Sequence, residues 1–237
     1  MLMNTTLTLA TALAATAVVA HAAEISGKVT LKGTPPPAQV IAAVKADANC
    51  GKFHPTDVMT RTFVVAADGG LANVLVYVKG GLEGKAFPAP VEKPLIDQVG
   101  CMYEPYVSAV MAGQAIQLRN SDPVMHNIMA TPKVNKGFNF AQATVGQVND
   151  RTFDKPELGV KLACSVHPWM VAYVSVLENP FYAVTDKDGK FIIKGELPDG
   201  KYTVEAFHQK LGAAGAVAQE IEVKGGKATA AYTLEIK

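Results

Sequence analysis

The sequence stretch with the most structural and chemical information is KLACSVHPWM, at residues 161–170. It places the thiol of Cys164, the imidazole of His167 and the thioether of Met170 close together in the chain. A copper centre that transfers single electrons uses two imidazoles, one thiolate and a weak axial thioether, because soft sulfur favours Cu(I) and imidazole suits both oxidation states. The stretch therefore predicts three ligands of such a centre and leaves one imidazole to be found.

The missing imidazole is expected from His126. A β-rich run, AIQL at residues 115–118, precedes this histidine. The Cys164 loop lies between two further β-rich runs, VKL at residues 160–162 and VAYVSV at residues 171–176. Both groups of candidate ligands are thus predicted on loops that adjoin strands.

These two segments resemble those of the cupredoxin family. The spacing Cys164-x2-His167-x2-Met170 is similar to the ligand loop of the amicyanin type of blue copper protein, and NSDPVMHNI, residues 120–128, resembles the loop with the first His ligand. The resemblance implies an all-β fold with a cupredoxin-like Greek-key β-sandwich or barrel. It also implies one type 1 copper ion held by His126, Cys164 and His167, with Met170 as the axial ligand.

The same resemblance assigns roles to three neighbouring residues. Asn127 matches an Asn that commonly follows the first His ligand and ties the ligand loops together, so it is expected to support the site from outside. Pro168 and Trp169, beside His167, would form an apolar patch where a redox partner docks. The partner class that this implies is a redox protein, such as a cytochrome, a dehydrogenase or a reductase.

Other interpretations of the Cys164 loop are open but explain less of it. A lone Cys in an exported protein is commonly half of a disulfide, and a Met beside Trp commonly lies in a core. A structural zinc site is normally closed by four N, S or O ligands, and zinc seldom uses a thioether such as that of Met170. A cysteine protease takes its nucleophile and base from separate elements, whereas Cys164 and His167 share one loop. Copper oxidases and nitrite reductases need further His-rich sites, and besides the two candidate ligands and a His near the N-terminus only His54 and His208 remain, so we expect an electron carrier and not an enzyme.

Composition agrees with a folded protein and argues against one class of partner. Of the 237 residues, 49% are hydrophobic and only 18% are charged, which is typical of a globular chain with one or two domains. The 22 basic residues nearly balance the 21 acidic ones, so nucleic acid is not an expected partner. Short β-rich runs dominate, for example at residues 63–65 and 73–78, and one helix is predicted at residues 40–48.

The first 23 residues have the pattern of a secretory signal peptide. Residues 7–20 are apolar but shorter than a membrane span, and AHA at residues 20–22 matches the small-x-small pattern of a cleavage site. Cleavage there predicts a mature chain that starts near Glu24 and has no transmembrane anchor. The expected location is the periplasm or the outside of the cell.

Export to an oxidising compartment changes what the three cysteines are expected to do. Cys50 and Cys101 can pair as a disulfide and leave Cys164 as the free thiol that a copper centre requires. The alternative is a second soft metal site, formed by Cys50 and Cys101 with His54 and the neighbouring methionine at position 102. Both interpretations are open at this stage.

Beyond Asn179 the sequence resembles a second family. Strand-like runs are separated by Asp-Gly pairs, and the pair Asp188-Gly189 is predicted to close a β-hairpin. The pattern is similar to the carboxypeptidase regulatory-like, transthyretin-like β-sandwich, which is a non-catalytic module. His208, in this region, is expected at the surface or at an interface.

Two divisions of the chain follow. In the first, residues 24–178 form the copper domain, with its core at about 98–178, and residues 179–237 form the C-terminal module. In the second, the strand at residues 24–34 belongs to the C-terminal module, and the copper domain is an insertion.

The leading hypothesis is an exported blue copper protein that carries single electrons between redox partners. The whole arrangement resembles exported proteins that are grouped with methylamine-utilisation cupredoxins. A copper chaperone or storage protein is one alternative, since it would use the same soft ligands. A structural or binding β-module without a metal is the other, and it follows from the transthyretin-like resemblance.

Overall fold

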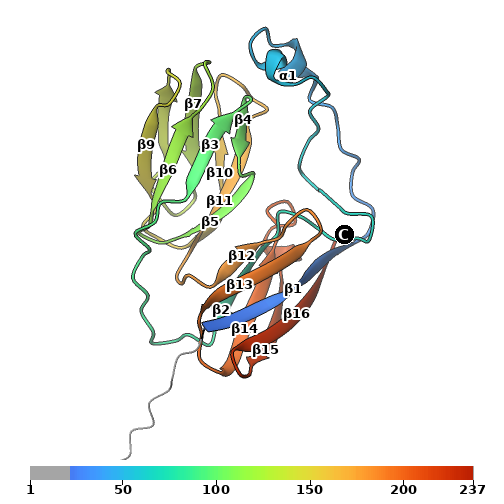
Figure 1. Cartoon of the computed structure of the whole chain (residues 1–237), viewed down its shortest axis with the longest axis vertical. Coiled ribbons are helices and arrows are strands. Elements are labelled where there is room, and N and C mark those ends of the chain that lie inside the picture. Colours follow the sequence, from blue (N-terminus) through green and yellow to red (C-terminus); the bar gives the residue numbers. More distant parts are fainter. Residues whose placement is uncertain (1–21, 237) are drawn as a thin grey trace, which may run out of the picture.

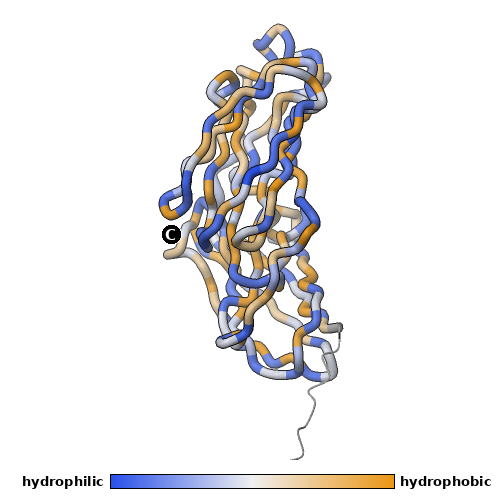
Figure 2. Tube along the Cα trace, turned by 90° about the vertical axis from the view of Figure 1, so that its left-hand side faces the viewer, coloured by the Kyte–Doolittle hydropathy of each residue, from blue (hydrophilic) through white to orange (hydrophobic). Residues whose placement is uncertain are grey.

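The computed structural model describes residues 22–236, and it consists almost entirely of β-strands (Figure 1). In this part of the chain the strands form four sheets, which enclose two main cores as two β-sandwiches. The prediction of an all-β fold is confirmed. Figure 2 shows polar and apolar residues interspersed along the strands, as expected where one face of a strand lies in a core.

The inner sandwich is built from one continuous stretch of chain. Its five-stranded sheet has the order β5-β11-β10-β7-β8, and its four-stranded sheet has the order β4-β3-β6-β9. Ile96, Leu118, Ile128 and Leu162 are among the buried residues of its core. The strands are β3 Leu95–Val99, β4 Met102–Glu104, β5 Val107–Met111, β6 Ala115–Asn120, β7 His126–Thr131, β8 Phe138–Gln142, β9 Val148–Thr152, β10 Glu157–Ala163 and β11 Val171–Leu177.

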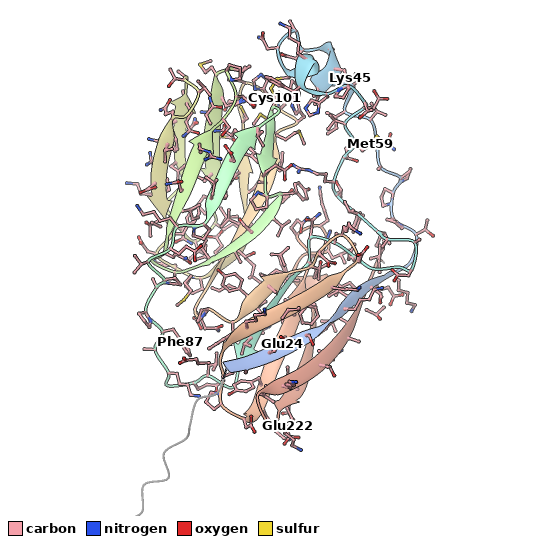
Figure 3. All side chains as sticks on the ribbon, viewed as in Figure 1. Glu24, Lys45, Met59, Phe87, Cys101 and Glu222 are labelled. Carbon is pink, nitrogen blue, oxygen red and sulfur yellow. A yellow bond between two sulfur atoms is a disulfide. The ribbon has the colours of Figure 1, made fainter. Side chains whose placement is uncertain are left out.

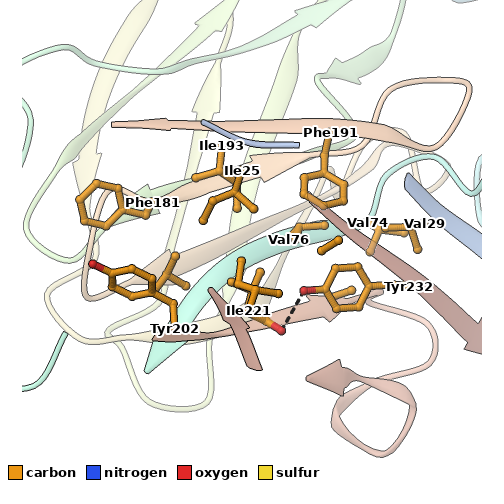
Figure 4. Packing of buried hydrophobic residues seen from close by; sticks show 14 of the residues in the cluster. Ile25, Val29, Val74, Val76, Phe181, Phe191, Ile193, Tyr202, Ile221 and Tyr232 are labelled. Carbon is orange, nitrogen blue, oxygen red and sulfur yellow. Dashed lines mark hydrogen bonds between the residues drawn. The ribbon is translucent and has the colours of Figure 1, made fainter. Parts of the chain in front are cut away.

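The outer sandwich combines strands from both ends of the described chain. Its sheets have the orders β13-β1-β16 and β12-β2-β14-β15. Figure 4 shows its core, where Ile25, Val76 and Phe191 lie near Tyr232, whose hydroxyl donates to the carbonyl oxygen of Val204 at 3.0 Å. The strands are β1 Ala22–Lys32, β2 Leu75–Gly80, β12 Tyr182–Val184, β13 Lys190–Glu196, β14 Gly200–Phe207, β15 Val217–Val223 and β16 Lys227–Glu235; the helical elements are α1 Ala42–Ala46, η1 Cys50–Phe53 and η2 Ala213–Gly215.

A small apolar cluster joins the two sandwiches. Leu75, Tyr77 and Phe207 of the outer sandwich lie with Ala109 and Leu177 of the inner sandwich in this cluster. All five are buried, so the two sandwiches share apolar surface where the chain passes from β11 to β12. Burial of this surface stabilises their contact.

Strand pairing bears on how the chain divides into domains. β1 runs antiparallel to β13 and parallel to β16. β2 pairs with β12 and β14, although both divisions expected from the sequence placed it in the copper domain. We propose, from these pairings, the division in which the copper domain is an insertion, at about residues 95–177, within the module formed by the two chain ends.

The helix expected at residues 40–48 is shorter in the structure, where α1 spans Ala42–Ala46. The carboxylate of Asp47 accepts hydrogen bonds from the backbone N–H groups of Asn49 and Cys50, at 2.9 and 2.8 Å. Such local side-chain bonds offer the backbone an alternative to helical hydrogen bonding. The helix therefore ends at Ala46, before the residue that was expected to close it.

The β-hairpin expected at Asp188-Gly189 is not formed, because β12 and β13 on either side belong to different sheets. The carboxylate of Asp186 accepts the backbone N–H groups of Asp188 and Lys190, each at 2.9 Å. Gly189 has a φ of 76°, and a Cβ there would lie 2.4 Å from the carbonyl oxygen of Val29. The turn therefore carries the chain between the two sheets in close contact with β1, where only glycine fits.

His208 is fully buried, so the surface position, one of the two that were expected, is wrong. Its ring stacks on the ring of Phe63, with a centroid distance of 4.9 Å. Residues 63–65 do not form the strand expected there, since Val65 makes only an isolated bridge with Leu71. The aromatic ring of Phe63 thus covers a histidine instead of joining a sheet.

Burial of His208 predicts a loss of stability in mild acid. Burial lowers the pKa of His208 to about 4, whereas an unfolded chain keeps the ordinary value near 6.5. Between these values the unfolded state binds a proton that the folded state does not, so stability falls as the pH falls. From this residue alone we expect the free energy of unfolding to drop by about 2 kcal/mol between pH 7 and pH 5.

Urea unfolding at both pH values would measure this loss. The variant His208→Gln should show a shallower pH dependence than the wild type. Equal slopes for the wild type and His208→Gln would contradict the prediction.

The predicted signal peptide lies almost entirely outside the described residues, which begin at Ala22. Ala22 and Ala23 pair with Glu196 and Gly195 at the start of β1. Residues 22–236 include no helix with the length and apolar character needed to cross a bilayer. The signal peptide and its cleavage position stay predictions.

Candidate metal centre

Strand pairing brings the two predicted ligand loops to one end of the inner sandwich. His126 is the first residue of β7, and Cys164 directly follows the last residue of β10. These strands are antiparallel neighbours, with Ala163 opposite Met129, so the start of β7 lies beside the end of β10. Met170 directly precedes β11, which pairs with β10 and returns the chain to the same sheet.

The donor atoms of three predicted ligands converge. Nδ1 of His126 lies 3.0 Å from Nδ1 of His167, and Sγ of Cys164 lies 3.9 Å from the same His167 atom. The three ligand atoms all lie within 4.8 Å of one another. His126 is fully buried, and His167 and Cys164 are each 3% exposed. An ion about 2.0–2.3 Å from each atom, as in zinc sites with the same ligand types, fits between donors at such separations.

The sulfur of Cys164 is held in a setting that favours the thiolate. Cys164 is the free cysteine of the described chain, and its Sγ accepts the backbone N–H groups of Asn127 and His167, each at 3.4 Å. Burial raises the pKa of the thiol, but its hydrogen bond with His126 and those from backbone N–H groups outweigh this effect and bring the pKa below its usual value. The thiolate is the form that binds metals.

Asp122 orients His126 and was not expected from the sequence. Its buried Oδ2 lies 2.8 Å from Nε2 of His126. The backbone N–H groups of Gly100 and Cys101 donate to the same carboxylate, both at 2.7 Å. Because a carboxylate only accepts, Nε2 of a neutral His126 carries the proton. The lone pair of Nδ1 is then directed at His167 and Cys164, as in metal sites where a carboxylate supports a histidine ligand.

The charges around the two imidazoles favour a cation at the centre. Burial raises the pKa of Asp122, yet the hydrogen bonds from His126 and the backbone bring that pKa below its usual value. Burial lowers the pKa of His126, but the hydrogen bonds with Asp122 and Cys164 bring it above its usual value. Burial and the neighbouring charge of His126 lower the pKa of His167. Two acidic groups whose pKa values are lowered, Asp122 and Cys164, therefore flank the imidazoles.

Asn127 connects β7 to the second ligand loop. Its Oδ1 accepts the backbone N–H and the hydroxyl of Ser165, at 3.1 and 3.0 Å. Its Nδ2 donates to Oδ1 of Asn139 at 2.6 Å and to the carbonyl oxygen of Phe140 at 3.1 Å, both in β8. These bonds restrict how far the two loops can move apart.

The rest of the second loop is folded tightly around His167. The backbone N–H of Met170 donates to the carbonyl oxygen of His167 at 2.9 Å, and the N–H of Cys164 donates to the carbonyl oxygen of Met170 at 3.2 Å. Met170 is fully buried in the core of the inner sandwich. Pro168 is exposed, whereas the ring of Trp169 lies 5.1 Å from the ring of His167, centroid to centroid.

A disulfide joins Cys50 to Cys101, as predicted, with their Cα atoms 5.7 Å apart. The alternative of a second soft metal site is wrong, because the two sulfurs bond to each other. His54 uses Nε2 for a hydrogen bond of 2.6 Å with the carbonyl oxygen of Gly100. Figure 3 labels Cys101 at the end of the inner sandwich, next to the segment that contains Lys45.

The disulfide fastens a segment that covers the candidate centre, residues 41–61, which we call the cap. The cap belongs to the long connection between β1 and β2 and contains α1 (Figure 1). Its Val44 lies in the core of the inner sandwich, and its Arg61 forms an ion pair with Glu104. The disulfide sulfurs lie within 4.8 Å of a ring nitrogen of His167. His167 therefore faces the cap.

The donor set fits the ion that the cupredoxin resemblance implies. Two imidazoles and one thiolate meet in a buried space, and a thioether follows in the same loop at Met170. Cu(I) and Cu(II) both accept this combination, whereas zinc seldom uses a thioether. His126, Cys164 and His167 are the residues of this chain that could hold the ion.

Solved structures of copper proteins resemble this chain at low similarity. A purple cupredoxin from Nitrosopumilus maritimus is 26% identical over 36% of this chain and 100% of its own, with a TM-score of 0.31. Amicyanin from Paracoccus versutus is 19% identical over 43% of this chain and 97% of its own, with a TM-score of 0.33. A copper-containing nitrite reductase from Thermus scotoductus SA-01 is 24% identical over 44% of this chain and 25% of its own, with a TM-score of 0.33. No family model and no curated protein matches the sequence.

Two features of the centre were not predicted from the sequence. Asp122 precedes His126 by four residues, and a carboxylate so close to a candidate ligand was a usable hint. The covering of His167 by the cap had no local signal, because it depends on the pairing of Cys50 with Cys101 across 51 residues.

Proposed function

We propose that this chain is an electron carrier with a single type 1 copper ion, bound by His126, Cys164 and His167 with Met170 as the axial ligand. The observation that carries the proposal is the convergence of two Nδ1 atoms and one Sγ atom in a buried space. Copper in such a ligand set gains and loses one electron. The partner would be a redox protein, and the location the periplasm or the outside of the cell.

The surrounding residues support such a role by keeping the site in one shape. Asp122 fixes the ring of His126, and Asn127 holds the two ligand loops together. Small rearrangement on gain or loss of an electron favours fast transfer, and rigid outer contacts limit that rearrangement. The cap and the core exclude water from His167 and Cys164.

A carrier is favoured over a copper chaperone by the burial of the ligands. A chaperone passes its ion to another protein through ligand exchange, which requires that a foreign ligand can reach the ion. His126, Cys164 and His167 are buried, and the disulfide holds the cap over His167. An oxidase or reductase is disfavoured, because such an enzyme needs a second copper site with further histidines. His54 is bonded to the carbonyl oxygen of Gly100, and the ring of His208 stacks on that of Phe63, so the two do not form such a site.

The test is a titration of the mature protein with one equivalent of Cu(II), followed by visible absorption. We expect an intense thiolate-to-copper charge-transfer band that is absent from Cys164→Ser, because the variant lacks the sulfur donor. Val166→Ser is a matched control in the same loop, since the side chain of Val166 is exposed, and it should keep the band. A folded wild type without the band, or a Cys164→Ser variant that retains it, would rule out the proposed centre.

A further inference from the structure

The cap covers the side of the site that lies nearest to the exposed residues of the second ligand loop. Ser165, Val166 and Pro168 are exposed, but His167 between them is only 3% exposed. Its ring faces the disulfide of the cap instead of solvent. A partner that docks on this loop therefore meets the cap and the neighbouring side chains before it reaches the imidazole.

Trp169 offers a route for electrons from the site to another part of the protein surface. Its ring lies 5.1 Å from that of His167 at an interplanar angle of 45°, and its Nε1–H donates to the carbonyl oxygen of Cys101 at 3.1 Å. The indole is half-buried and forms part of the wall of a surface cavity of about 200 Å³, which we call the Trp169 pocket. The indole thus connects the ring of His167 to a concave part of the surface.

The Trp169 pocket is aromatic and basic. Tyr106 and Tyr173 line it in an edge-to-face pair, with centroids 5.7 Å apart. Three cationic side chains line it as well: Arg61, Lys161 and Lys210. The described residues that line the pocket include no Asp or Glu, so the charged side chains of its wall are all positive.

The three cations come from different parts of the molecule. Arg61 ends the cap, where it pairs with Glu104 outside the pocket and lies over the ring of Tyr106, 4.8 Å from the centroid. Lys161 lies on β10 next to the ligand loop, and Lys210 follows β14 of the outer sandwich. Both lysines are exposed and can reach an incoming anion. A cavity with one sign of charge attracts the opposite charge and raises its local concentration.

We propose that electrons enter and leave the site through Trp169, and that the Trp169 pocket receives an acidic side chain of the partner protein. This inference rests on the proposed function, since it concerns the route to the same centre. The partner is thereby characterised as a redox protein with an acidic docking surface. In the copper-loaded protein, one electron would pass from Cu(I), which would become Cu(II), to the small anionic oxidant hexacyanoferrate(III), which would become hexacyanoferrate(II); no bond would form or break and no proton would move.

The first test does not depend on copper. Hexacyanochromate(III) is a redox-inert, paramagnetic trianion that broadens NMR signals near the place where it binds. The chain has one Trp, so the indole N–H of Trp169 is a single identifiable signal. In the copper-free protein we expect this signal to broaden saturably, and the broadening to be lost in Lys161→Glu/Lys210→Glu but kept in Lys194→Glu. Broadening confined to Ser165 and Val166, or none at all, would overturn the inference.

The second test uses the copper-loaded protein and two small oxidants of opposite charge. At low ionic strength, Lys161→Glu/Lys210→Glu should oxidise at least about tenfold more slowly with hexacyanoferrate(III) and faster with tris(phenanthroline)cobalt(III), because the local field changes sign. Lys194→Glu, an exposed lysine of β13 on the outer sandwich, should leave both rates near those of the wild type. Unchanged rates in the double variant would overturn the inference.

The two tests separate this inference from the proposed function. A protein that binds no copper fails the absorption test in the preceding section, yet its Trp169 signal still reports whether the pocket attracts anions. A protein with the charge-transfer band and no response to the lysine substitutions keeps the proposed function and loses the docking route.

Discussion

Replacing both Cys50 and Cys101 by alanine is expected to lower the free energy of unfolding by about 4 kcal/mol, because the disulfide closes a loop of roughly fifty residues in the unfolded chain. The same change should release the cap, which is otherwise held by a few contacts such as the burial of Val44 and the ion pair of Arg61 with Glu104. Urea unfolding, followed by circular dichroism, measures the first effect.

Release of the cap has a readout of its own. Diethyl pyrocarbonate modifies accessible imidazoles, so His167 of the copper-free double variant should react faster than in the wild type, where it is 3% exposed. His208, which is fully buried in the outer sandwich, is the internal control and should stay protected in both proteins. A double variant with wild-type protection of His167 would show that the cap stays closed without its disulfide. In that case contacts other than the covalent bond hold it.

Replacing Asp122 by asparagine is expected to weaken Cu(II) binding by about ten- to a hundredfold, the usual effect of removing a group that supports a histidine ligand. The carboxylate accepts Nε2–H of His126 and two backbone N–H groups, so asparagine keeps an acceptor but loses the negative charge. The charge stabilises Cu(II) more than Cu(I). The reduction potential should therefore rise, by about 59 mV for each tenfold loss in relative affinity.

Asp97→Asn is a matched control for this prediction. Asp97 is also largely buried in the inner sandwich, where it pairs with Arg119 and accepts the hydroxyl of Ser121. Loss of that charge should affect stability without a comparable rise in the reduction potential. Potentials that rise equally in the two variants would indicate a general charge effect, and an unchanged potential in Asp122→Asn would contradict the role given to Asp122.

Much of the inner sandwich was predictable, because its strands and ligand loops are encoded locally. The β-rich runs at residues 115–118 and 171–176 lie in β6 and β11, and the Asn that follows His126 does link the loops through Ser165. Alternation of apolar and polar residues indicates which face of a strand enters a core. This pattern can be recognised without knowing which strands pair with each other.

The features that could not be predicted depend on contacts between distant segments. The turn at Asp186 has hairpin composition, but its flanking strands pair with β1 and β2, more than a hundred residues earlier. Likewise, His208 has no local feature that indicates burial, and it is the ring of Phe63 that covers it. Local patterns set the conformation of a turn or strand, whereas tertiary pairing decides which sheet it joins.

The pairing of β1 with β16 has a consequence for the order in which this protein assembles. The inner sandwich is complete in sequence once β11 has been made, but the outer sandwich needs its last strand, β16, about sixty residues later. At the usual pace of translation, about 5–20 residues per second, that gap corresponds to several seconds. Until β13 is made, in about the first third of that interval, β1 has neither of its hydrogen-bonded neighbours, and it lacks β16 until the end, so it exposes an unpaired strand edge throughout. Recombinant production is therefore most vulnerable to aggregation through this first strand.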